Sequence, residues 1–505
     1  MEKKRELNYK WIYFGIAFLM LVFMIYYSDI KSFWYDEVYQ LGLVRKELSL
    51  SEIFRNYYTL GDYTPPLFAL LAAVLVRVFP FVNAYLLIVS EVAVAAGVYL
   101  LGVIGEKVKN KLTGVLAVIL SGTSYMLIVK AGHEFRAYGL LFFVSVLTLY
   151  TFIIRYQKQK ECPMKYHLFY GASLILLVYT HYYGAVVCGA FFFFDAFLFL
   201  KKRVKLSAII PYLMAGFSFA PWLLLVLLHH ESSMTSFWVD PPNWRTVIDV
   251  LKFFASNNEY LFMIMIFALV LSAVRMIVAM RKKTFDYEKN GIETLLLWLI
   301  LFVMGTMYLY GAVINPGGGI FVHRYFFCIF PCFVLLMAMA LDAVICWIDS
   351  CKKIPYLGVI ACSFLFLYFG AANYNAVVVD TNSLFEPYEE SAKELAKKGD
   401  ISNEKTVILM ADCEYVKEGY RYYFEKKGKV TKVNLLSQHE DDFENKLLQY
   451  DKIYFMEGHE DITKKTKRIL KKNYKKIYSR TKHMISAYLQ KDLYDVKYKD
   501  REEAE

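Results

Sequence analysis

Several short motifs that mark familiar soluble enzymes are missing from this 505-residue chain. It has no Gly-rich Walker A loop, no Gly-x-Ser-x-Gly elbow, no His-Glu-x-x-His helix and no paired Cys-x-x-Cys. ATP-driven chemistry and zinc-dependent hydrolysis therefore lose their usual sequence support.

Cysteine is also sparse, with eight residues along the whole chain. Only Cys413 falls in the C-terminal quarter, so that part of the chain cannot form an internal disulfide. Cys328 and Cys332 lie four residues apart in an apolar run, where they fit helix packing. A metal role is not favoured, because no ligand-type residues accompany them.

The N-terminus lacks the small residues of a signal-peptide cleavage site. A basic start, "MEKKRELNYK", leads into the apolar residues 11–27, which are followed by "YYSDIKSFWYDE". This pattern predicts a retained membrane helix that begins in the cytoplasm.

What the chain does contain is apolar sequence in long runs. Hydrophobic residues make up 57% of it, and runs of 17 or more recur over the first three quarters, which predicts a polytopic membrane protein. The net charge of +11 does not indicate nucleic-acid binding here, because the basic residues cluster in short loops between apolar runs. That distribution is typical of cytoplasmic loops.

Placing every strongly basic loop on one side predicts about 11 crossings. The expected spans are residues 11–27, 82–105, 113–129, 139–154, 167–183, 184–200, 206–228, 259–280, 291–314, 325–347 and 355–372. The run 66–79 is short and contains Arg77, so we expect a half-depth or tilted helix there. If it spans, the count becomes about 12 and loops such as "EKVKNK" move to the outside.

The composition changes near residue 374, which predicts domains at 1–373 and 374–505. In the second, "TVILMAD" (406–412), "KVTKVNLL" (429–436) and "DKIYFMEG" (451–458) read as buried strands with helices between and after them. The alternation predicts a small α/β domain outside the cytoplasm with a mainly parallel sheet. Its role is structural or the docking of an acceptor.

An acidic pair, Asp36 and Glu37, follows the first apolar run, and "DYTPPLFALL" (62–71) follows that pair. A carboxylate can act as a general base or bind a metal. An ordinary polar interfacial loop explains it equally well. The two prolines at 65 and 66 would start a helix and orient Tyr63 and Thr64 beside the acidic loop.

Three further stretches place polar groups on the same predicted outer face. They are "GHEFRAYG" (132–139), "VYTHYYGA" (178–185) and "GIFVHRYFF" (319–327). Arginine suits phosphate oxygens, although an arginine that reaches toward lipid headgroups is the alternative. An aromatic belt explains the tyrosines better than the histidines and arginines. Glu91, inside a predicted span, is either functional or hydrogen-bonded to a neighbouring helix.

Together these stretches resemble the integral-membrane glycosyltransferases of the GT-C fold, in particular the family 39 and ArnT-like group related to protein O-mannosyltransferases. The acidic pair, "YTPPL", "EFRAY", "YTHYYG" and "HRY" occur in matching order over roughly residues 1–370. Thr64 departs from the His or Lys that often precedes Pro-Pro in that group. Either Lys130, His133 or Arg324 would replace its contact with the donor phosphate, or the donor differs.

The resemblance implies an all-α polytopic membrane domain of GT-C type with about 11–13 helices, followed by the small α/β domain. It implies transfer of a hexose or pentose from a polyprenyl-phosphate donor to an extracytoplasmic lipid, glycan or protein acceptor. Asp36 would be the general base, and Glu37 would support it. The implied donor phosphate-binding residues are Arg136, Arg324, His323 and Lys130. The implied substrate-binding residues are Tyr63, Thr64, His133, Glu134, Tyr138, His181 and Tyr182.

Three other functions remain open on the sequence, and one of them is a non-catalytic assembly scaffold with a docking tail. A metal-dependent oligosaccharide transferase with a pyrophosphate donor would use Asp36 and Glu37 as ligands of a divalent cation. A monophosphate donor needs no cofactor. A lipid-linked sugar flippase would place ionisable groups near the midplane and often shows internal repeats, and no convincing repeat is visible. The lone tail cysteine and short basic N-terminus suit a bacterial plasma membrane.

Overall fold

The computed structural model describes residues 8–29, 32–59, 64–79, 83–158, 161–229, 240–284, 286–315, 320–354, 356–377, 388–398, 400–426, 432–480 and 485–490. The chain divides into two compact units. The first comprises Met1–Ser28, Phe54–Phe68 and Leu87–Val379, and the second comprises Asp29–Ile53, Ala69–Leu86 and Asp380–Glu505.

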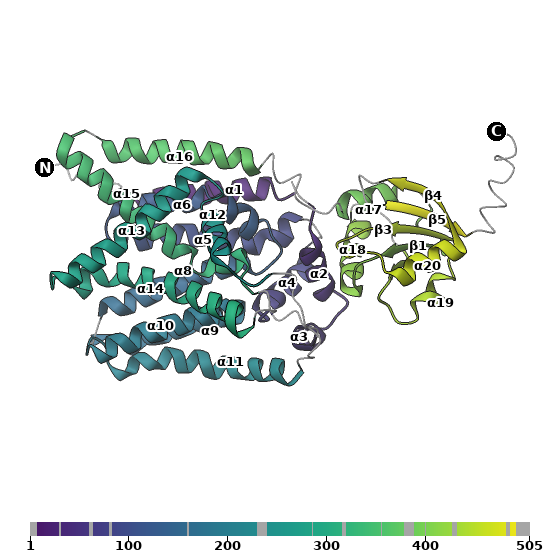
Figure 1. Cartoon of the computed structure of the whole chain (residues 1–505), viewed down its shortest axis with the longest axis horizontal. Helices are drawn as coiled ribbons and strands as arrows, with labels where there is room; N and C mark the ends of the chain where they lie inside the picture. Colours follow the sequence, from purple (N-terminus) through teal and green to yellow (C-terminus); the bar gives the residue numbers. More distant parts are fainter. Residues whose placement is uncertain are drawn as a thin grey trace. The chain divides into compact units, whose positions relative to one another are not determined.

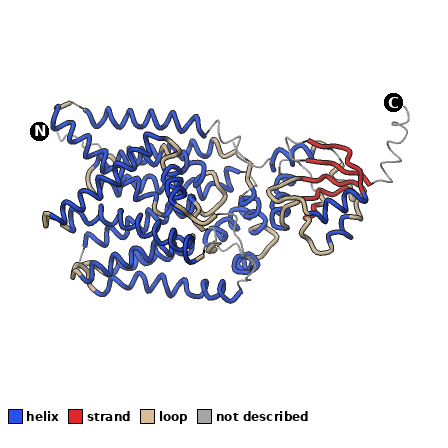
Figure 2. Tube along the Cα trace, in the orientation of Figure 1, coloured by secondary structure: helices blue, strands red, loops and turns tan. Residues whose placement is uncertain are grey.

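The first unit is helical (Figures 1 and 2). Its α-helices are α1 (Lys10–Tyr26), α5 (Asn83–Val108), α6 (Lys111–Gly122), α7 (Tyr125–Leu127), α8 (Tyr138–Lys158), α9 (Met164–Thr180), α10 (Tyr182–Leu200), α11 (Ile210–His229), α12 (Trp244–Phe254), α13 (Glu259–Arg281), α14 (Tyr287–Leu309), α15 (Phe330–Lys352) and α16 (Leu357–Asn375). Short 3-10 or π turns join them at η1 (Ile128–Gly132), η3 (Leu206–Ile209), η4 (Tyr310–Ile314) and η5 (His323–Cys328). Three helices are divided between the units, namely α3 (Leu50–Thr59), α4 (Leu67–Val78) and α5, whose first turn lies in the second unit.

Eight of the described helices are long and apolar enough to cross a membrane, which confirms the predicted polytopic helical domain. A ninth span is formed if α6 and the segment Tyr125–Gly132, bent by 60° at their junction, count as one. The 12 residues of α4 reach only about 18 Å, against the roughly 30 Å of a hydrocarbon core. That length agrees with the half-depth helix expected for 66–79.

The helices differ in how deeply they lie inside the first unit. In α15, 67% of the apolar window is buried, and the helix packs against α6, α13 and α14. In α16 only 17% is buried, so most of its apolar surface faces outward, as a lipid-facing helix requires. Burial in this unit is therefore graded from α8, at 72%, and α15 to outward-facing helices such as α16.

A buried ion pair joins α8 to α10. The Arg155 guanidinium donates to the Asp195 carboxylate, and the exposed fractions of the two side chains are 2% and 4%. The hydroxyl of Tyr212 on α11 donates to the same carboxylate oxygen over 2.5 Å. Arg155 also lies over the rings of Phe152 and Tyr170, at 4.9 and 5.0 Å. Arg155, which the sequence places at the start of a basic loop, is thus a packing residue between α8, α9, α10 and α11.

The second unit is an α/β fold whose helices flank one sheet (Figures 1 and 2). Its elements are α2 (Tyr35–Leu43), α17 (Tyr388–Ala396), β1 (Thr406–Met410), α18 (Glu414–Lys426), β2 (Leu435–Ser437), α19 (Phe443–Leu447), β3 (Lys452–Met456), α20 (Lys464–Asn473), β4 (Tyr474–Arg480) and β5 (Ile485–Gln490). The strand order is β2-β1-β3-β5-β4. Strands β2, β1 and β3 pair in parallel, and β5 runs antiparallel to both of its neighbours, β3 and β4. The predicted small α/β domain is therefore confirmed.

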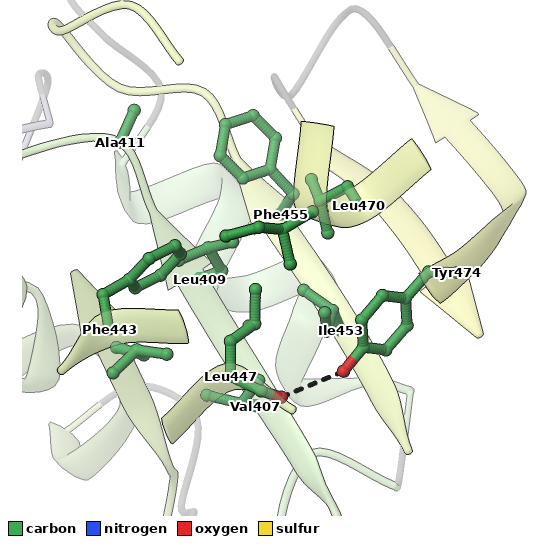
Figure 3. Packing of buried hydrophobic residues seen from close by; sticks show 11 residues of the cluster. Val407, Leu409, Ala411, Phe443, Leu447, Ile453, Phe455, Leu470 and Tyr474 are labelled. Atoms are coloured by element: carbon green, nitrogen blue, oxygen red, sulfur yellow. Dashed lines mark hydrogen bonds between the residues drawn. The ribbon is translucent and has the colours of Figure 1, made fainter. Parts of the chain in front are cut away.

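The core of this unit lies on one face of the parallel strands (Figure 3). Alternate residues of β1 and β3 point into it, because successive side chains of a strand face opposite ways. Figure 3 shows these side chains packed against Phe443 and Leu447 of α19 and Leu470 of α20, with the Tyr474 hydroxyl donating to the Leu447 carbonyl at 2.9 Å. All five residues of β1 are buried, as expected for a strand covered on both faces.

Helix α2 belongs to this second unit and packs tightly on α18. A Cβ on Gly42 would lie 1.9 Å from the carbonyl oxygen of Tyr415, and a Cβ on Gly419 would lie 1.8 Å from that of Val38. Only glycine permits two helix backbones to approach this closely. The α/β fold therefore holds in place the helix that carries Asp36 and Glu37.

Asp412, at the end of β1, gives this unit a pH-dependent stability. It is fully buried, and burial raises its pKa to about 6, although it accepts hydrogen bonds from the Glu460 N–H and the Tyr388 hydroxyl, both at 2.9 Å. The folded state then binds the proton more tightly than the unfolded state. Protonation of Asp412 makes its full contribution to the free energy of unfolding below about pH 4. That contribution, about 3 kcal/mol, is lost as the pH rises through 6.

We therefore expect Asp412→Asn, which keeps both hydrogen bonds, to gain melting temperature relative to wild type between pH 5 and pH 7.5. The difference between the two proteins should widen with pH, and thermal scans at both pH values measure it. Asp441→Asn, at an exposed site, is the control and should follow wild type. A difference between Asp412→Asn and wild type that does not change with pH contradicts the assignment.

Candidate active site

The acidic pair lies in the first turn of α2, where the helix dipole favours negative charge. Glu37 is fully buried, and its Oε2 accepts a hydrogen bond from the Trp34 backbone N–H at 3.2 Å. That contact satisfies one of the backbone donors that a helix start leaves open. Asp36 is half-buried. Of the two carboxylates, Glu37 secures the helix and Asp36 is the one that solvent reaches.

A cluster of charged residues in the first unit brings together four of the predicted positions: Lys130, Glu134, Arg136 and Arg324. Lys130 on η1 pairs with the fully buried Glu134 at 3.3 Å. The Ser90 hydroxyl of α5 lies within hydrogen-bonding distance of the carbonyls of Glu134 and Arg136, at 3.2 and 3.4 Å, which fixes the loop after η1. The Arg324 guanidinium lies 5.5 Å from the centre of the Tyr138 ring. Three cations and one carboxylate leave this cluster with a formal charge of +2.

His181 lies next to the charged cluster in the turn between α9 and α10. Its Nδ1 accepts a hydrogen bond from the Tyr183 N–H at 3.2 Å, so it caps α10. Burial first, and then the positive charges of Arg136 and Arg324, lower the pKa of His181 to about 3. The ring is therefore neutral at pH 7, and the positive charge of the site comes from the lysine and the two arginines.

His323 and Tyr138 complete this group. His323 lies within electrostatic range of Arg324, Lys130 and Glu134, and its ring packs on Phe253 of α12 at 4.3 Å. Tyr138 is 2% exposed, and its ring lies 6.0 Å from that of Tyr325. These contacts place η5 and the start of α8 against the same charged loop.

His133 occupies a different environment from its neighbours in sequence. It is fully buried; its Nε2 lies 2.9 Å from the Met24 carbonyl of α1 and 3.8 Å from Glu91 Oε1 of α5. Neither carboxylate oxygen of Glu91 has a hydrogen-bond partner among the described residues, so the hydrogen bond to a neighbouring helix that the sequence left open for it is not seen. The predicted contact of His133 with substrate stays a prediction.

The other predicted substrate residues are placed as follows. The Tyr182 hydroxyl accepts from the indole N–H of Trp222 at 3.3 Å, which ties α10 to α11. Thr64 is half-buried at the start of the Pro-Pro segment. Tyr63 lies outside the described residues.

Sequence reasoning missed two supporting residues, namely Ser90 and Phe253. Phe253 lies on α12, in the stretch between the predicted spans 206–228 and 259–280, where no helix was predicted. The signal for that helix was present, because Asn243 caps it and Val247, Val250 and Phe254 recur at helical spacing. Ser90 acts only through contacts with a distant segment, which no local pattern reveals.

Comparison with known proteins identifies the fold. No family profile and no curated protein sequence matches this chain. Among solved structures, it is similar to ArnT from Cupriavidus metallidurans bound to undecaprenyl phosphate, with 10% identity and a TM-score of 0.58. The apo form of the same protein gives 11% and 0.60. In both comparisons the alignment covers 94% of this chain and 97% of the other.

A second protein shares the architecture. The apo oligosaccharyltransferase of Archaeoglobus fulgidus is 12% identical with a TM-score of 0.55, over 90% of this chain and 70% of the other. At these identities the likeness shows the fold. The chain therefore has the GT-C fold, a helical membrane domain with a small α/β domain.

Proposed function

We propose that this protein is a membrane glycosyltransferase that moves a sugar from a polyprenyl-phosphate carrier to an acceptor outside the cytoplasm. The observation that carries the proposal is the end-to-end likeness to a structure that holds undecaprenyl phosphate, together with a net positive loop cluster. A lipid phosphate is an anion that such a cluster suits. Fold alone does not define chemistry, so the residues must supply the rest.

In this reaction Asp36 accepts the proton of the acceptor hydroxyl. The acceptor oxygen forms a bond to the anomeric carbon of the sugar while the bond from that carbon to the phosphate oxygen breaks. The proton ends on Asp36, and the bonding electron pair leaves with the polyprenyl phosphate. General bases of this kind typically contribute about 10²–10⁴-fold to the rate. Glu37 accepts the hydrogen bond from the Trp34 N–H at the start of α2, and it would thereby keep Asp36 in position.

Arg136, Arg324 and Lys130 would meet the charge that develops on the leaving phosphate. Preorganised cations stabilise such charge without reorganisation at the moment of reaction. Glu134 holds Lys130 at 3.3 Å, and the Tyr138 ring supports Arg324 from one side. His181 and His323 would line the site as neutral or packing groups. The lipid tail would lie along the apolar helices.

The proposal is tested by incubating the purified protein in lipid nanodiscs with undecaprenyl-phosphate sugars and following release of free undecaprenyl phosphate. Release that depends on the sugar donor supports a transferase. Release that a chelator abolishes would point instead to the metal-dependent oligosaccharide transferase. Transbilayer movement of the donor without release would point to a flippase.

The charged cluster makes a specific prediction for Arg324. We expect Arg324→Ala to lower kcat/KM for the donor about 100-fold, because one charge-stabilising group is lost. Arg324→Lys should lose about 10-fold, since lysine keeps the charge but not the planar fork. Arg245→Ala, an exposed arginine of α12 stacked on its own neighbour Trp244, is the matched control and should stay within twofold of wild type. Equal turnover for Arg324→Ala and the control contradicts the assignment.

A further inference from the structure

Polar and aromatic side chains gather at the carboxyl edge of the parallel strands of the second unit. Cys413 follows β1, His439 follows β2, and His459 and Glu460 follow β3. The chain order across these strands reverses at β1, because β2 lies on one side of it and β3 on the other. In open α/β sheets, ligands bind outside the carboxyl ends of the strands at such a reversal.

These groups are fixed by direct contacts that include Tyr35 of α2. The Tyr35 hydroxyl donates to Glu460 Oε1 at 3.0 Å, and His439 Nε2 lies 2.9 Å from Glu460 Oε2. The Tyr35 ring lies 4.7 Å from the His459 ring. Its other neighbours are Tyr39, at 6.4 Å and nearly parallel, and the thiol of Cys413, at 3.7 Å from the hydroxyl.

The turn that carries Glu460 is rigid. The Glu460 N–H donates to the buried Asp412 carboxylate, and a Cβ on Gly458 would lie 1.6 Å from Asp412 Oδ2. Only glycine fits at that position, so the loop after β3 has little freedom. A preorganised set of ligand groups loses less entropy on binding.

The cluster is open to solvent. His439 is 44% exposed and Glu460 31%, while the residue His459 is exposed and Tyr35 and Tyr39 are half-buried. It offers flat ring faces beside one carboxylate and two imidazoles. Ring faces suit the C–H surface of a sugar, and the polar groups suit its hydroxyls, which both donate and accept. A phosphate or carboxylate ligand fits poorly, because Glu460 would repel it.

The cluster is directly linked to the proposed general base. Tyr35 precedes Asp36 in the same turn of α2. Helix α2 packs against α18 at Gly42 and Gly419. Resting on the function proposed above, we infer that the carboxyl edge of this sheet binds the acceptor and that the acceptor is a saccharide. The α/β fold would thereby present a sugar hydroxyl next to the carboxylate that deprotonates it.

The test measures binding of linear hexaoses of glucose, N-acetylglucosamine and mannose to the full-length protein in nanodiscs by saturation-transfer NMR and calorimetry. We expect at least one hexaose to bind, with Kd raised about 10-fold or more in His459→Ala and Glu460→Gln. His459→Phe, which keeps a ring, should recover most of the affinity. Glu457→Gln, an exposed acid on the same loop, is the matched control and should not change Kd.

Failure of this inference is distinguishable from failure of the transferase. No hexaose binding, or binding that is equal in His459→Ala, Glu460→Gln and the control, overturns the saccharide site. Donor-dependent release of undecaprenyl phosphate tests the transferase alone, because it requires no saccharide. In the control Glu457→Gln that release should remain at the wild-type level when water is the only acceptor.

Discussion

Replacing Asp36 by Asn is expected to lower sugar transfer at least about 1,000-fold. The substitution keeps the size of the side chain and its place in the first turn of α2, but the amide cannot accept the acceptor proton. Donor affinity should change little, since the donor phosphate is assigned to other residues. Rates of transfer and donor KM, measured separately with purified protein, check both statements.

Glu37→Gln is the matched control for this experiment. Glutamine still accepts the hydrogen bond from the Trp34 N–H, so the helix start is retained and the rate should fall less than about 10-fold. If Glu37→Gln is as inactive as Asp36→Asn, the experiment does not identify Asp36 as the general base. Full activity of Asp36→Asn would contradict the proposed mechanism.

Nine of the 11 predicted spans correspond to long apolar segments among the described residues, with the bent pair at 111–132 counted as one, because length and apolarity define them. The predicted spans 11–27 and 167–183 correspond to α1 and α9, which have 17 residues each and are not among those segments. The runs 82–105, 259–280 and 325–347 correspond to α5, α13 and α15 within a few residues. The short interfacial helices α2 and α12 were not predicted, because their apolar residues occupy one face among polar ones. Strand β4, "YKKIYSR", was missed because its residues do not alternate strictly between apolar and polar, and β5 was missed with it.

The charged loop could be predicted in part, and the acidic pair only in outline. "GHEFRAYG" and "HRY" indicated a shared face, and Lys130, Glu134, Arg136 and Arg324 do lie together. No local pattern indicates that Glu37 is a buried helix cap or that His181 is neutral. Both properties come from packing, because a residue's burial depends on which segments cover it.

The second unit also revises how the C-terminal domain is understood. Its sheet is formed by residues after 400, yet α2 from the first loop packs on α18. The contact depends on two glycines, Gly42 and Gly419, that lie almost 380 residues apart in the chain. No local pattern connects them, and only the fold shows that the acidic pair and the α/β domain form one unit.

The buried pair between Arg155 and Asp195 supplies the largest expected effect on stability. Replacing Asp195 by Leu should destabilise the protein by about 3–5 kcal/mol, because Arg155 would stay buried without a counter-charge. Arg155→Met should destabilise the protein by a similar amount, because the Asp195 carboxylate would then stay buried without a counter-charge. Unfolding of the detergent-solubilised protein, followed by heat or by denaturant, measures both changes.

The double variant Arg155→Met with Asp195→Leu is expected to recover to within about 1 kcal/mol of wild type, because no buried charge remains. The Tyr212 hydroxyl would then pair with that of Tyr170, which already lies 3.3 Å away. Methionine would replace the guanidinium over the Phe152 and Tyr170 rings with a polarisable sulfur. A double variant as unstable as the sum of the single ones would give a coupling energy of zero between Arg155 and Asp195. That outcome would contradict the view that each single variant is unstable because it leaves the other charge buried and unpaired.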